Sequence, residues 1–454
     1  MTGEELLQKI AERPARLLFD RLYGNTDAEA GIRRYVSLVT GLLSQDAFPR
    51  KNFPETAGDL RLFTAAGRTE LGGNHTDHNR GRVLAASIQM DTAAVVAPRC
   101  DSRVFFRSIG YPDVVVDLAV NGGMDLAPRE TEKGTTEALV RGIAAEFAAR
   151  GVRVGGFTAN ADSTVLPGSG LSSSASVEVL LCRIFDSLFG GGRRGALEIA
   201  RIGQKAENVY FGKPCGLMDQ AACAYGGVVA LDFARPEDPL VKRIDVDLAG
   251  AGYTLCVVNT GGSHAGLTPD YAAIPAEMKS VAAFFGKETL SECDEEAVEA
   301  RAADIRKSLG DRALLRAFHF FDENQRGPAM LCALEKLSAA GSPASRQDAM
   351  KTYLKLVNES GNSSWELLQN VYSTQNVKEQ GIAVALALTR DFLRSEASAP
   401  GACRVHGGGF AGTIQAYIPA PALDGYRGLM DGVFGPGSVT PLRIRPVGAE
   451  ELIL

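Results

Sequence analysis

The chain has 454 residues, of which 45% are hydrophobic and 22% charged, and its formal net charge is -6 at pH 7. This length and apolar content predict a large buried core and two to three domains, and they exclude a disordered chain. No basic stripe or long apolar run is present, and the eight cysteines form no C-x-x-C pair. Charges near the N-terminus exclude a secretory signal. We therefore expect a cytoplasmic protein without a nucleic-acid or membrane partner.

Residues 1–59 form a predicted helical extension, because apolar positions recur at helical spacing over 4–18 and 32–43. Strand-forming residues then predict strands at 61–66, 83–88, 92–97, 104–108, 228–233, 253–259, 412–418 and 442–447. Helical patterns occupy 137–150, 174–188 and most of 274–395. This mixed order predicts an α+β fold with two lobes, which we place at 60–240 and 241–454.

Residues 167–176, P-G-S-G-L-S-S-S-A-S, form a candidate phosphate-binding loop before a predicted helix. Glycines let backbone N–H groups point at an anion, a helix start adds positive charge, and hydroxyls bond oxygens. The loop lacks the lysine of a Walker A motif. A serine-capped loop with no ligand is the alternative reading. The candidate nucleotide-binding residues are Pro167, Gly168, Gly170, Leu171, Ser172, Ser173 and Ser174.

This loop resembles the second signature of the GHMP kinases, P-x-G-x-G-L-S-S-S-A. Residues 67–81, G-R-T-E-L-G-G-N-H-T-D-H-N-R-G, are similar to the galactokinase signature G-R-V-N-L-I-G-E-H-T-D-Y-N-x-G, and residues 404–412, R-V-H-G-G-G-F-A-G, to the third signature, R-M-T-G-G-G-F-G-G. The three motifs also occur in the family's order. The resemblance implies an N-terminal lobe like that of a ribosomal protein, a C-terminal ferredoxin-like lobe, and a cleft between them.

Residues 206–220, A-E-N-V-Y-F-G-K-P-C-G-L-M-D-Q, resemble the galactokinase stretch A-E-x-x-x-x-G-x-P-C-G-x-M-D-Q. The resemblance implies that Asp219 is the catalytic aspartate facing the anomeric hydroxyl, with Arg68 beside it. An arginine there would keep the carboxyl ionised and stabilise charge on the transferred phosphoryl group. The resemblance also assigns Ser174 and Glu207 to Mg²⁺, which prefers oxygen ligands. Whether Asp219 removes the proton or only orients the hydroxyl stays open.

For the sugar, the resemblance carries over a set of polar residues and one glycine: Arg68, Asn74, His75, Asp77, Gly216, Asp219 and Tyr271. Asn74 departs from the family, which has a glutamate there for the 6-hydroxyl, and His78 replaces a tyrosine. Asn74 can still bond a 6-hydroxyl, but it also tolerates a 6-carboxylate, whereas two like charges about 4 Å apart cost about 4 kcal/mol at an effective dielectric near 20.

The predicted function is ATP-dependent phosphorylation of the anomeric hydroxyl of galactose, with Mg²⁺, by a monomer or weak homodimer. Galacturonate is the alternative acceptor, and a non-catalytic sugar and nucleotide sensor is the alternative class. The intact H-T-D stretch disfavours a GHMP kinase that acts on a non-sugar alcohol. Thr136 stands where the family has a tryptophan near the adenine, so the stacking of the base is open.

Overall fold

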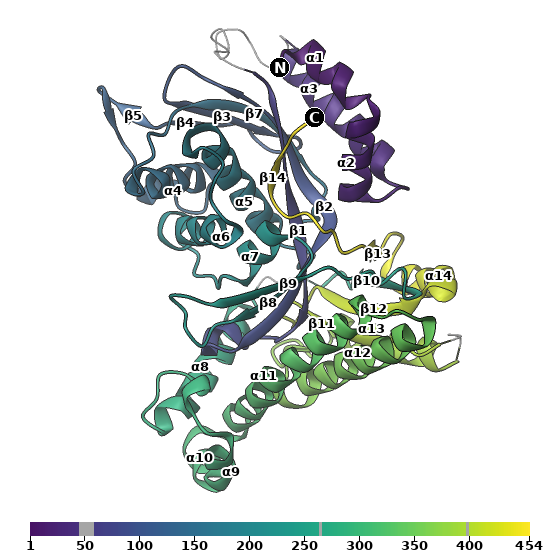
Figure 1. Cartoon of the computed structure of the whole chain (residues 1–454). Coiled ribbons are helices and arrows are strands. Elements are labelled where there is room, and N and C mark those ends of the chain that lie inside the picture. The colour runs from purple at the N-terminus through teal and green to yellow at the C-terminus, as the bar shows by residue number, and fades with distance from the viewer. Residues whose placement is uncertain (45–58, 263–265, 396–398) are drawn as a thin grey trace.

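The computed structural model describes residues 1–44, 59–262, 266–395 and 399–454. Two long antiparallel strands, β1 (Arg61–Gly72) and β2 (Arg82–Pro98), run from the upper part of the molecule to the lower part (Figure 1). The register between them shifts between Ala66 and Arg68 and again between Glu70 and Gly72. Because β2 is unbroken from Arg82 to Pro98, the two segments predicted at 83–88 and 92–97 are parts of one continuous strand.

The first sheet has the order β14-β1-β2-β7-β3-β4, with β8 and β9 continuing from the other part of β2. Its remaining strands are β3 (Arg103–Ser108), β4 (Val114–Asp117), β7 (Phe157–Ser163), β8 (Val228–Asp232), β9 (Leu240–Ile244) and β14 (Glu450–Leu452). Only the β3–β7 pair is parallel among the described pairs of this sheet. A small hairpin, β5 (Ala119–Val120) and β6 (Gly123–Met124), projects beside it.

Helices cover both faces of this sheet (Figure 1). Alternate residues of a strand point to opposite faces, so Val95 of β2 packs against the N-terminal helices while Val96 packs against the other layer. The first layer is α1 (Gly3–Ile10), α2 (Arg13–Tyr23) and α3 (Ala28–Leu43). The second layer is α4 (Thr136–Ala149), α5 (Ser173–Phe185), α6 (Ala196–Lys205) and α7 (Met218–Tyr225).

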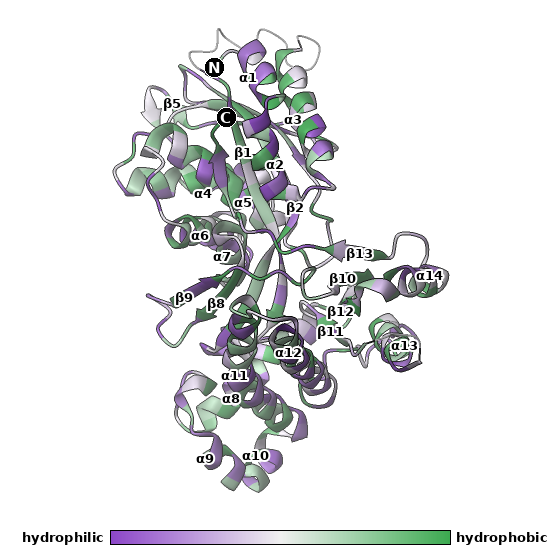
Figure 2. Ribbon diagram, turned by 45° about the vertical axis from the view of Figure 1, so that its right-hand side comes forward, coloured by the Kyte–Doolittle hydropathy of each residue, from purple (hydrophilic) through white to green (hydrophobic). Residues whose placement is uncertain are grey.

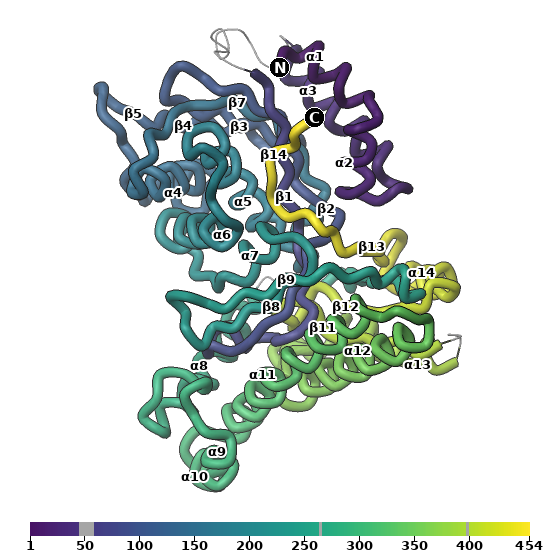
Figure 3. Tube along the Cα trace, in the orientation of Figure 1, coloured from purple at the N-terminus to yellow at the C-terminus, as the bar shows by residue number. Residues whose placement is uncertain are grey.

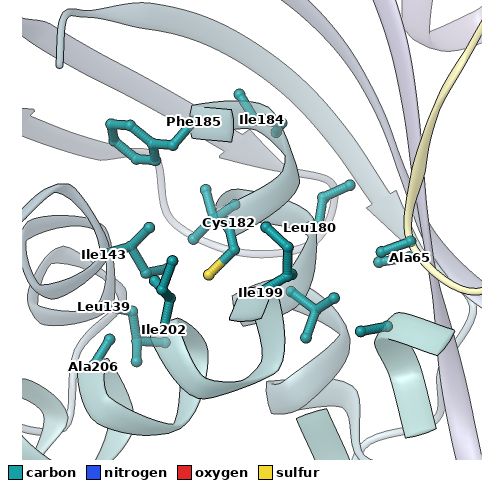
Figure 4. Close-up of a cluster of buried hydrophobic side chains, with 14 of the residues drawn as sticks. Ala65, Leu139, Ile143, Leu180, Cys182, Ile184, Phe185, Ile199, Ile202 and Ala206 are labelled. Atoms are coloured by element: carbon teal, nitrogen blue, oxygen red, sulfur yellow. The ribbon is translucent and has the colours of Figure 1, made fainter. Parts of the chain in front are cut away.

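The core of the second layer is made by apolar side chains of α4, α5 and α6 that meet over β1 (Figure 4). Ile143 of α4, Leu180 of α5 and Ile202 of α6 are each 0% exposed. Burying such a side chain fully contributes about 1.5–3 kcal/mol relative to leaving it exposed. This packing holds the start of α5, which follows the candidate phosphate loop, in a fixed place on the sheet.

The helix predicted over 4–18 is two helices in the structure. α1 ends at Ile10 and α2 begins at Arg13, with Pro14 in its first turn. Proline is well suited to that position but has no N–H to continue a helix through it. Thr2 caps α1, with Glu5 closing a capping box. Residues 1–44, the part of the extension before Asp59 that the structure describes, therefore form three α-helices, all packed on the sheet.

The second lobe contains an antiparallel sheet in the order β11-β12-β10-β13. In chain order its elements are β10 (Tyr253–Asn259), a helical segment, β11 (Ala402–His406), β12 (Thr413–Pro419), α14 (Leu423–Phe434) and β13 (Val439–Leu442). This is the β-α-β-β-α-β order of a ferredoxin-like fold. The predicted α+β class and the two-lobed arrangement are thus confirmed.

The helical segment inserted between β10 and β11 spans most of the lower part of the molecule (Figure 2). It consists of α8 (Thr268–Phe284), α9 (Glu295–Ala300), α10 (Ala302–Leu309), α11 (Asp311–Ser338), α12 (Pro343–Ser363) and α13 (Gly381–Ser395). Figure 2 shows that α12 alternates between hydrophilic and hydrophobic residues, as expected for a helix with one buried face. Among the described residues, no helix combines the length and apolar character needed to cross a membrane.

The C-terminal segment returns from the second lobe to the first sheet, as the yellow trace in Figure 3 shows. A strand was predicted over 442–447, but β13 ends at Leu442 and only Ile444 forms an isolated bridge, to Ile88. The segment crosses β2 near its middle, where the Arg445 N–H donates to Ser87 O at 2.9 Å. Pro446 then removes a donor. The segment therefore links the two sheets as extended chain and ends as β14.

Candidate active site

The candidate phosphate loop lies against β1 and ends at α5. Gly168 and Gly170 have φ of +70° and +73°, which favours glycine, and Ser172 is left-handed at φ +57°. The Arg68 N–H donates to Leu171 O at 3.1 Å, and a Cβ at Gly67 would lie 3.0 Å from that same oxygen. The loop is therefore held close to β1, with the N-terminus of a 13-residue helix behind it.

Arg68 and Asp219 form a bidentate ion pair beside this loop. Arg68 Nε and Nη2 donate to the two carboxylate oxygens of Asp219 at 2.8 and 2.7 Å, and Nη1 donates to Gly170 O. Ser172 Oγ also donates to Asp219. Burial raises the pKa of Asp219, but the charge of Arg68 and these hydrogen bonds outweigh burial and lower it. The Asp219 side chain is one third (33%) exposed, so the ionised carboxylate is partly accessible to solvent.

Glu207 lies in a π-helical turn, Ala206–Phe211, that extends α6. Its carboxylate is buried and both oxygens are occupied: Lys213 Nζ is 3.2 Å from Oε1, and Gln220 Nε2 donates to Oε2 at 2.9 Å. Gln220 Nε2 also donates to Glu178 Oε2 of α5 at 2.9 Å. Burial and the charge of Glu207 raise the pKa of Glu178 to about 8. One amide thus joins two buried glutamates next to Asp219.

The residues assigned to Mg²⁺ fit a site that is completed by a nucleotide. Within the described ranges, no group of three His, Cys, Asp or Glu side chains could hold a metal alone. Glu178 Oε1 and Gln220 Oε1 are buried without a hydrogen-bond partner in that same part of the chain. Ser174 is exposed on the first turn of α5, one turn before Glu178 and on the same face. Mg²⁺ takes few protein oxygens and relies on phosphates and water.

Four of the predicted sugar residues, His75, Asp77, Gly216 and Tyr271, contact other motifs of the chain. A Cβ at Gly216 would lie 2.4 Å from Asp77 Oδ2, so only glycine lets Asp77 approach the segment that carries Asp219. His75 Nε2 is 3.0 Å from Gly408 O, and burial lowers the pKa of His75 to about 3, which keeps the ring neutral. Tyr271 Oη donates to Gly409 O at 2.9 Å. The third motif thus lies between His75 and Tyr271.

Asn74 lies in a buried polar network. It is 1% exposed, and its Nδ2 donates to Glu70 Oε1 at 3.0 Å and to Gly407 O at 2.8 Å. Its Oδ1 accepts from Asn370 at 2.9 Å. Glu70 in turn pairs with Arg404 at 2.6 Å. Both amide hydrogens of Asn74 are used within the protein, so its contact with a sugar 6-hydroxyl remains a prediction.

Several residues around Glu207 and Asn74 had no predicted role. Glu178, Gln220 and Lys213 surround Glu207, and His319 binds Asn74 O at 2.9 Å through Nε2. A weak signal existed for two of them, because Glu178 follows Ser174 by one helical turn and Gln220 follows Asp219 directly. His319 had no such signal, since it lies on α11, far from every motif.

The remaining predicted residues are placed as follows. Thr136, which stands at the family's tryptophan position, is the first residue of α4. Trp365 lies in the second lobe, where the Arg390 guanidinium is 5.4 Å from its ring centroid. His264, seven residues before Tyr271, lies outside the described residues.

Comparisons with known proteins agree with these motifs. Residues 138–227 match the model of the GHMP kinases N terminal domain, and residues 50–98 match the galactokinase galactose-binding signature. A galactokinase of Streptomyces lividans is 31% identical over 84% of this chain and 87% of that protein, and a galactokinase of Streptomyces coelicolor is 32% identical over 60% and 69%. The chain belongs to the galactokinase family of GHMP kinases. It is therefore an enzyme of the sugar-kinase type.

Solved structures show the same fold for this galactokinase family member. Lactococcus lactis galactokinase complexed with galactose has a TM-score of 0.69 at 23% identity, covering 89% of this chain and 98% of that chain. The Methanococcus jannaschii mevalonate kinase has a TM-score of 0.56 at 11% identity, covering 86% and 99%. The fold is thus shared across GHMP kinases, whereas the match of residues 50–98, which include Asp77, is to a signature of galactokinases.

Proposed function

We propose that this chain transfers the γ-phosphoryl group of ATP to the anomeric hydroxyl of galactose. The observation that carries the proposal is the bidentate pair of Arg68 and Asp219, which lies directly beside the phosphate loop and is tied to it through Ser172 and Gly170. An acceptor hydroxyl at Asp219 and a phosphate in the loop would therefore be neighbours. Phosphoryl transfer requires this positioning more than covalent help from the protein.

Asp219 accepts the hydrogen of the anomeric hydroxyl and orients its oxygen toward the phosphorus. The lowered pKa of Asp219 keeps the carboxylate ionised at neutral pH, so it can serve as an acceptor without first losing a proton. Arg68 stabilises the charge that spreads over the phosphoryl oxygens in the transition state. Backbone N–H groups of residues 168–174 and the start of α5 hold the remaining phosphates of ATP.

Ser174 and Glu207 would hold Mg²⁺ together with phosphate oxygens, and the buried unpartnered oxygens of Glu178 and Gln220 support a cation here. When bound, Mg²⁺ neutralises charge on the β- and γ-phosphates. Gln220 keeps the Glu207 carboxylate in place by donating a hydrogen bond to its Oε2. Because Gln220 is the residue after Asp219, this bond also fixes Glu207 relative to Asp219.

His75, Asp77, Gly216 and Tyr271 are the proposed contacts for the galactose hydroxyls. Galacturonate is a second candidate acceptor because the side chain at position 74 is neutral and the neighbouring carboxylate, Glu70, is paired with Arg404. The positive charge of Arg404 would therefore offset the repulsion between Glu70 and a sugar 6-carboxylate. A sensor without activity is disfavoured, since the ion pair of Asp219 and the serine loop are both present.

The test is transfer from ATP to galactose and galacturonate, measured as ADP release and as sugar 1-phosphate. We expect galactose 1-phosphate from the wild type and a loss of at least about 100-fold in kcat for Asp219→Asn, with ATP affinity within a few-fold. Glu207→Gln should instead raise the Mg²⁺ concentration at half-maximal rate. Substantial turnover by Asp219→Asn, or product formed from neither sugar, would contradict the proposal.

A further inference from the structure

Lys213 contacts Glu207, one of the residues assigned to Mg²⁺, and has no role in the function described above. It follows Gly212, which ends the π-helical turn with φ +85°. The backbone N–H groups of Gly212 and Lys213 both donate to Glu207 O, at 2.9 and 3.2 Å. The Lys213 side chain then returns to the same residue, with Nζ 3.2 Å from Glu207 Oε1. The motif that resembles the family leaves this position variable.

Lys213 is a cation near the site that takes no part in the ion pair of Arg68 and Asp219. Arg68 uses Nε and Nη2 on the two oxygens of Asp219, and the two buried glutamates share a neutral amide. Burial raises the pKa of Glu178, and the charge of Lys213 opposes that rise. The same charge acts with Arg68 to lower the pKa of Asp219. Lys213 therefore lies within electrostatic reach of all three carboxylates.

The pair of Lys213 and Glu207 is suited to exchange partners. The lysine side chain is 61% exposed, whereas that of Glu207 is 4% exposed. The exposed ammonium can leave the pair without being withdrawn from water, and the buried carboxylate of Glu207 keeps its hydrogen bond from Gln220. The phosphate loop has no lysine of its own, although phosphate sites in other folds use a lysine to reach the β- and γ-phosphates. The ammonium of Lys213 acts on Asp219, which Ser172 of the loop also contacts, so it could supply that charge.

We propose that Lys213 leaves Glu207 when nucleotide binds and donates hydrogen bonds to a phosphate oxygen of ATP. This inference rests on the proposed function for the identity of the nucleotide, and it adds a phosphate-binding residue that the family motif does not assign. Glu207 Oε1 becomes available at the same time. Lys213 thus pairs with the buried carboxylate of Glu207 in the free enzyme and neutralises phosphate charge in the complex.

The experiment measures the affinity of ATP for the full-length protein by calorimetry in excess EDTA, without sugar. We expect Lys213→Met to bind ATP about tenfold more weakly, which corresponds to about 1.4 kcal/mol, and Lys213→Arg to stay within about threefold of the wild type. Lys205→Met is the matched control. Lys205 also pairs with a buried glutamate, Glu146, at 2.8 Å, and is 57% exposed. Its loss should leave ATP affinity unchanged.

In the ATP titration, either wild-type affinity in Lys213→Met or an equal loss in Lys205→Met would overturn the inference. Turnover supplies a second readout, because the loss of a phosphate contact should raise KM for ATP and leave KM for the sugar unchanged. An effect on the sugar KM alone would also refute the role. If the wild type phosphorylates no sugar, the proposed function fails, yet the metal-free ATP titration still decides on Lys213.

Discussion

At the scale of single residues, the exchange between positions 70 and 74 departs most clearly from the family. The signature has asparagine and then glutamate where this chain has Glu70 and Asn74. The structure places the two side chains in contact, with Asn74 Nδ2 3.0 Å from Glu70 Oε1, and Arg404 neutralises the carboxylate. The chain therefore keeps one amide and one carboxylate in this network but exchanges their positions.

This exchange predicts strong coupling between the two positions. Asn74→Glu alone places two buried carboxylates side by side and should lower the free energy of unfolding by about 3 kcal/mol. Glu70→Asn with Asn74→Glu restores the family order and should recover at least about 1 kcal/mol of that loss. Urea denaturation of both single variants and the double variant measures the coupling. Additive effects would show that the two side chains act independently.

The same double variant separates the two acceptors. A carboxylate at position 74 adds an acceptor for a 6-hydroxyl and repels a 6-carboxylate, whereas the single variant would combine this effect with repulsion from Glu70. For a galactose enzyme, kcat/KM should stay similar or improve. For a galacturonate enzyme it should fall about 10- to 1000-fold, at about 1.4 kcal/mol per factor of ten.

At the scale of elements, the helical extension does more than cover the sheet. Arg34 of α3 and Tyr23 of α2 both bind Asp91 of β2, which is 0% exposed and also pairs with Arg445 at 2.8 Å. Asp91 O accepts from the Thr164 N–H at 2.9 Å, and Thr164 directly precedes the segment that leads into the phosphate loop. Arg34 also pairs with Asp162 of β7 at 2.5 Å, so the extension stabilises the strand from which that loop departs.

Arg34→Met should therefore lower the free energy of unfolding by about 3 kcal/mol, because it removes one partner from a buried ionic cluster. The neighbouring Arg33→Met is the control. Arg33 is 68% exposed and lies 3.6 Å from Glu29, so its loss should change stability by less than about 0.5 kcal/mol. Chemical denaturation of both variants is the measurement. Similar midpoints for the two would mean that α3 packs on the sheet through its apolar face alone.

At the scale of the whole molecule, the lobes meet through buried polar groups near the phosphate loop. His406 of β11 is 3% exposed and lies between Thr69 of β1 and Thr413 of β12, with both ring-nitrogen to hydroxyl distances at 3.0 Å. A Cβ at Gly170 of the loop would lie 3.1 Å from His406 Nδ1. Burial, reinforced by the charges of Arg68 and Arg404, lowers the pKa of His406 to about 3.

This lowered pKa predicts acid sensitivity of the assembled lobes. Between pH 6.5, the ordinary histidine pKa, and about pH 3, His406 binds a proton in the unfolded chain but not in the folded protein. The contribution of neutral His406 to the free energy of unfolding is therefore complete above about pH 6.5 and is lost as pH falls. From pH 7 to pH 5 the loss due to His406 is about 2 kcal/mol. Urea midpoints at both pH values should fall less in His406→Gln. Parallel pH dependences would exclude His406 as the cause.

The sequence by itself determined the family and the reaction type, because the signatures are short strings in which each residue's chemistry follows from its near neighbours. The phosphate loop and Asp219 were predicted in this way, and several strands followed from their β-branched and aromatic residues, but β4, β7, β9, β11 and β14 were not predicted. The resemblance also implied that Arg68 lies beside Asp219, 151 residues away, as the structure shows. Other contacts between distant segments could not be predicted, such as that of Arg404 with Glu70, which are 334 residues apart. Only the packing of both lobes around β1 decided which buried polar groups pair, because an unpaired buried group costs about 1–3 kcal/mol and its partner is chosen by position in space and not by position in the sequence.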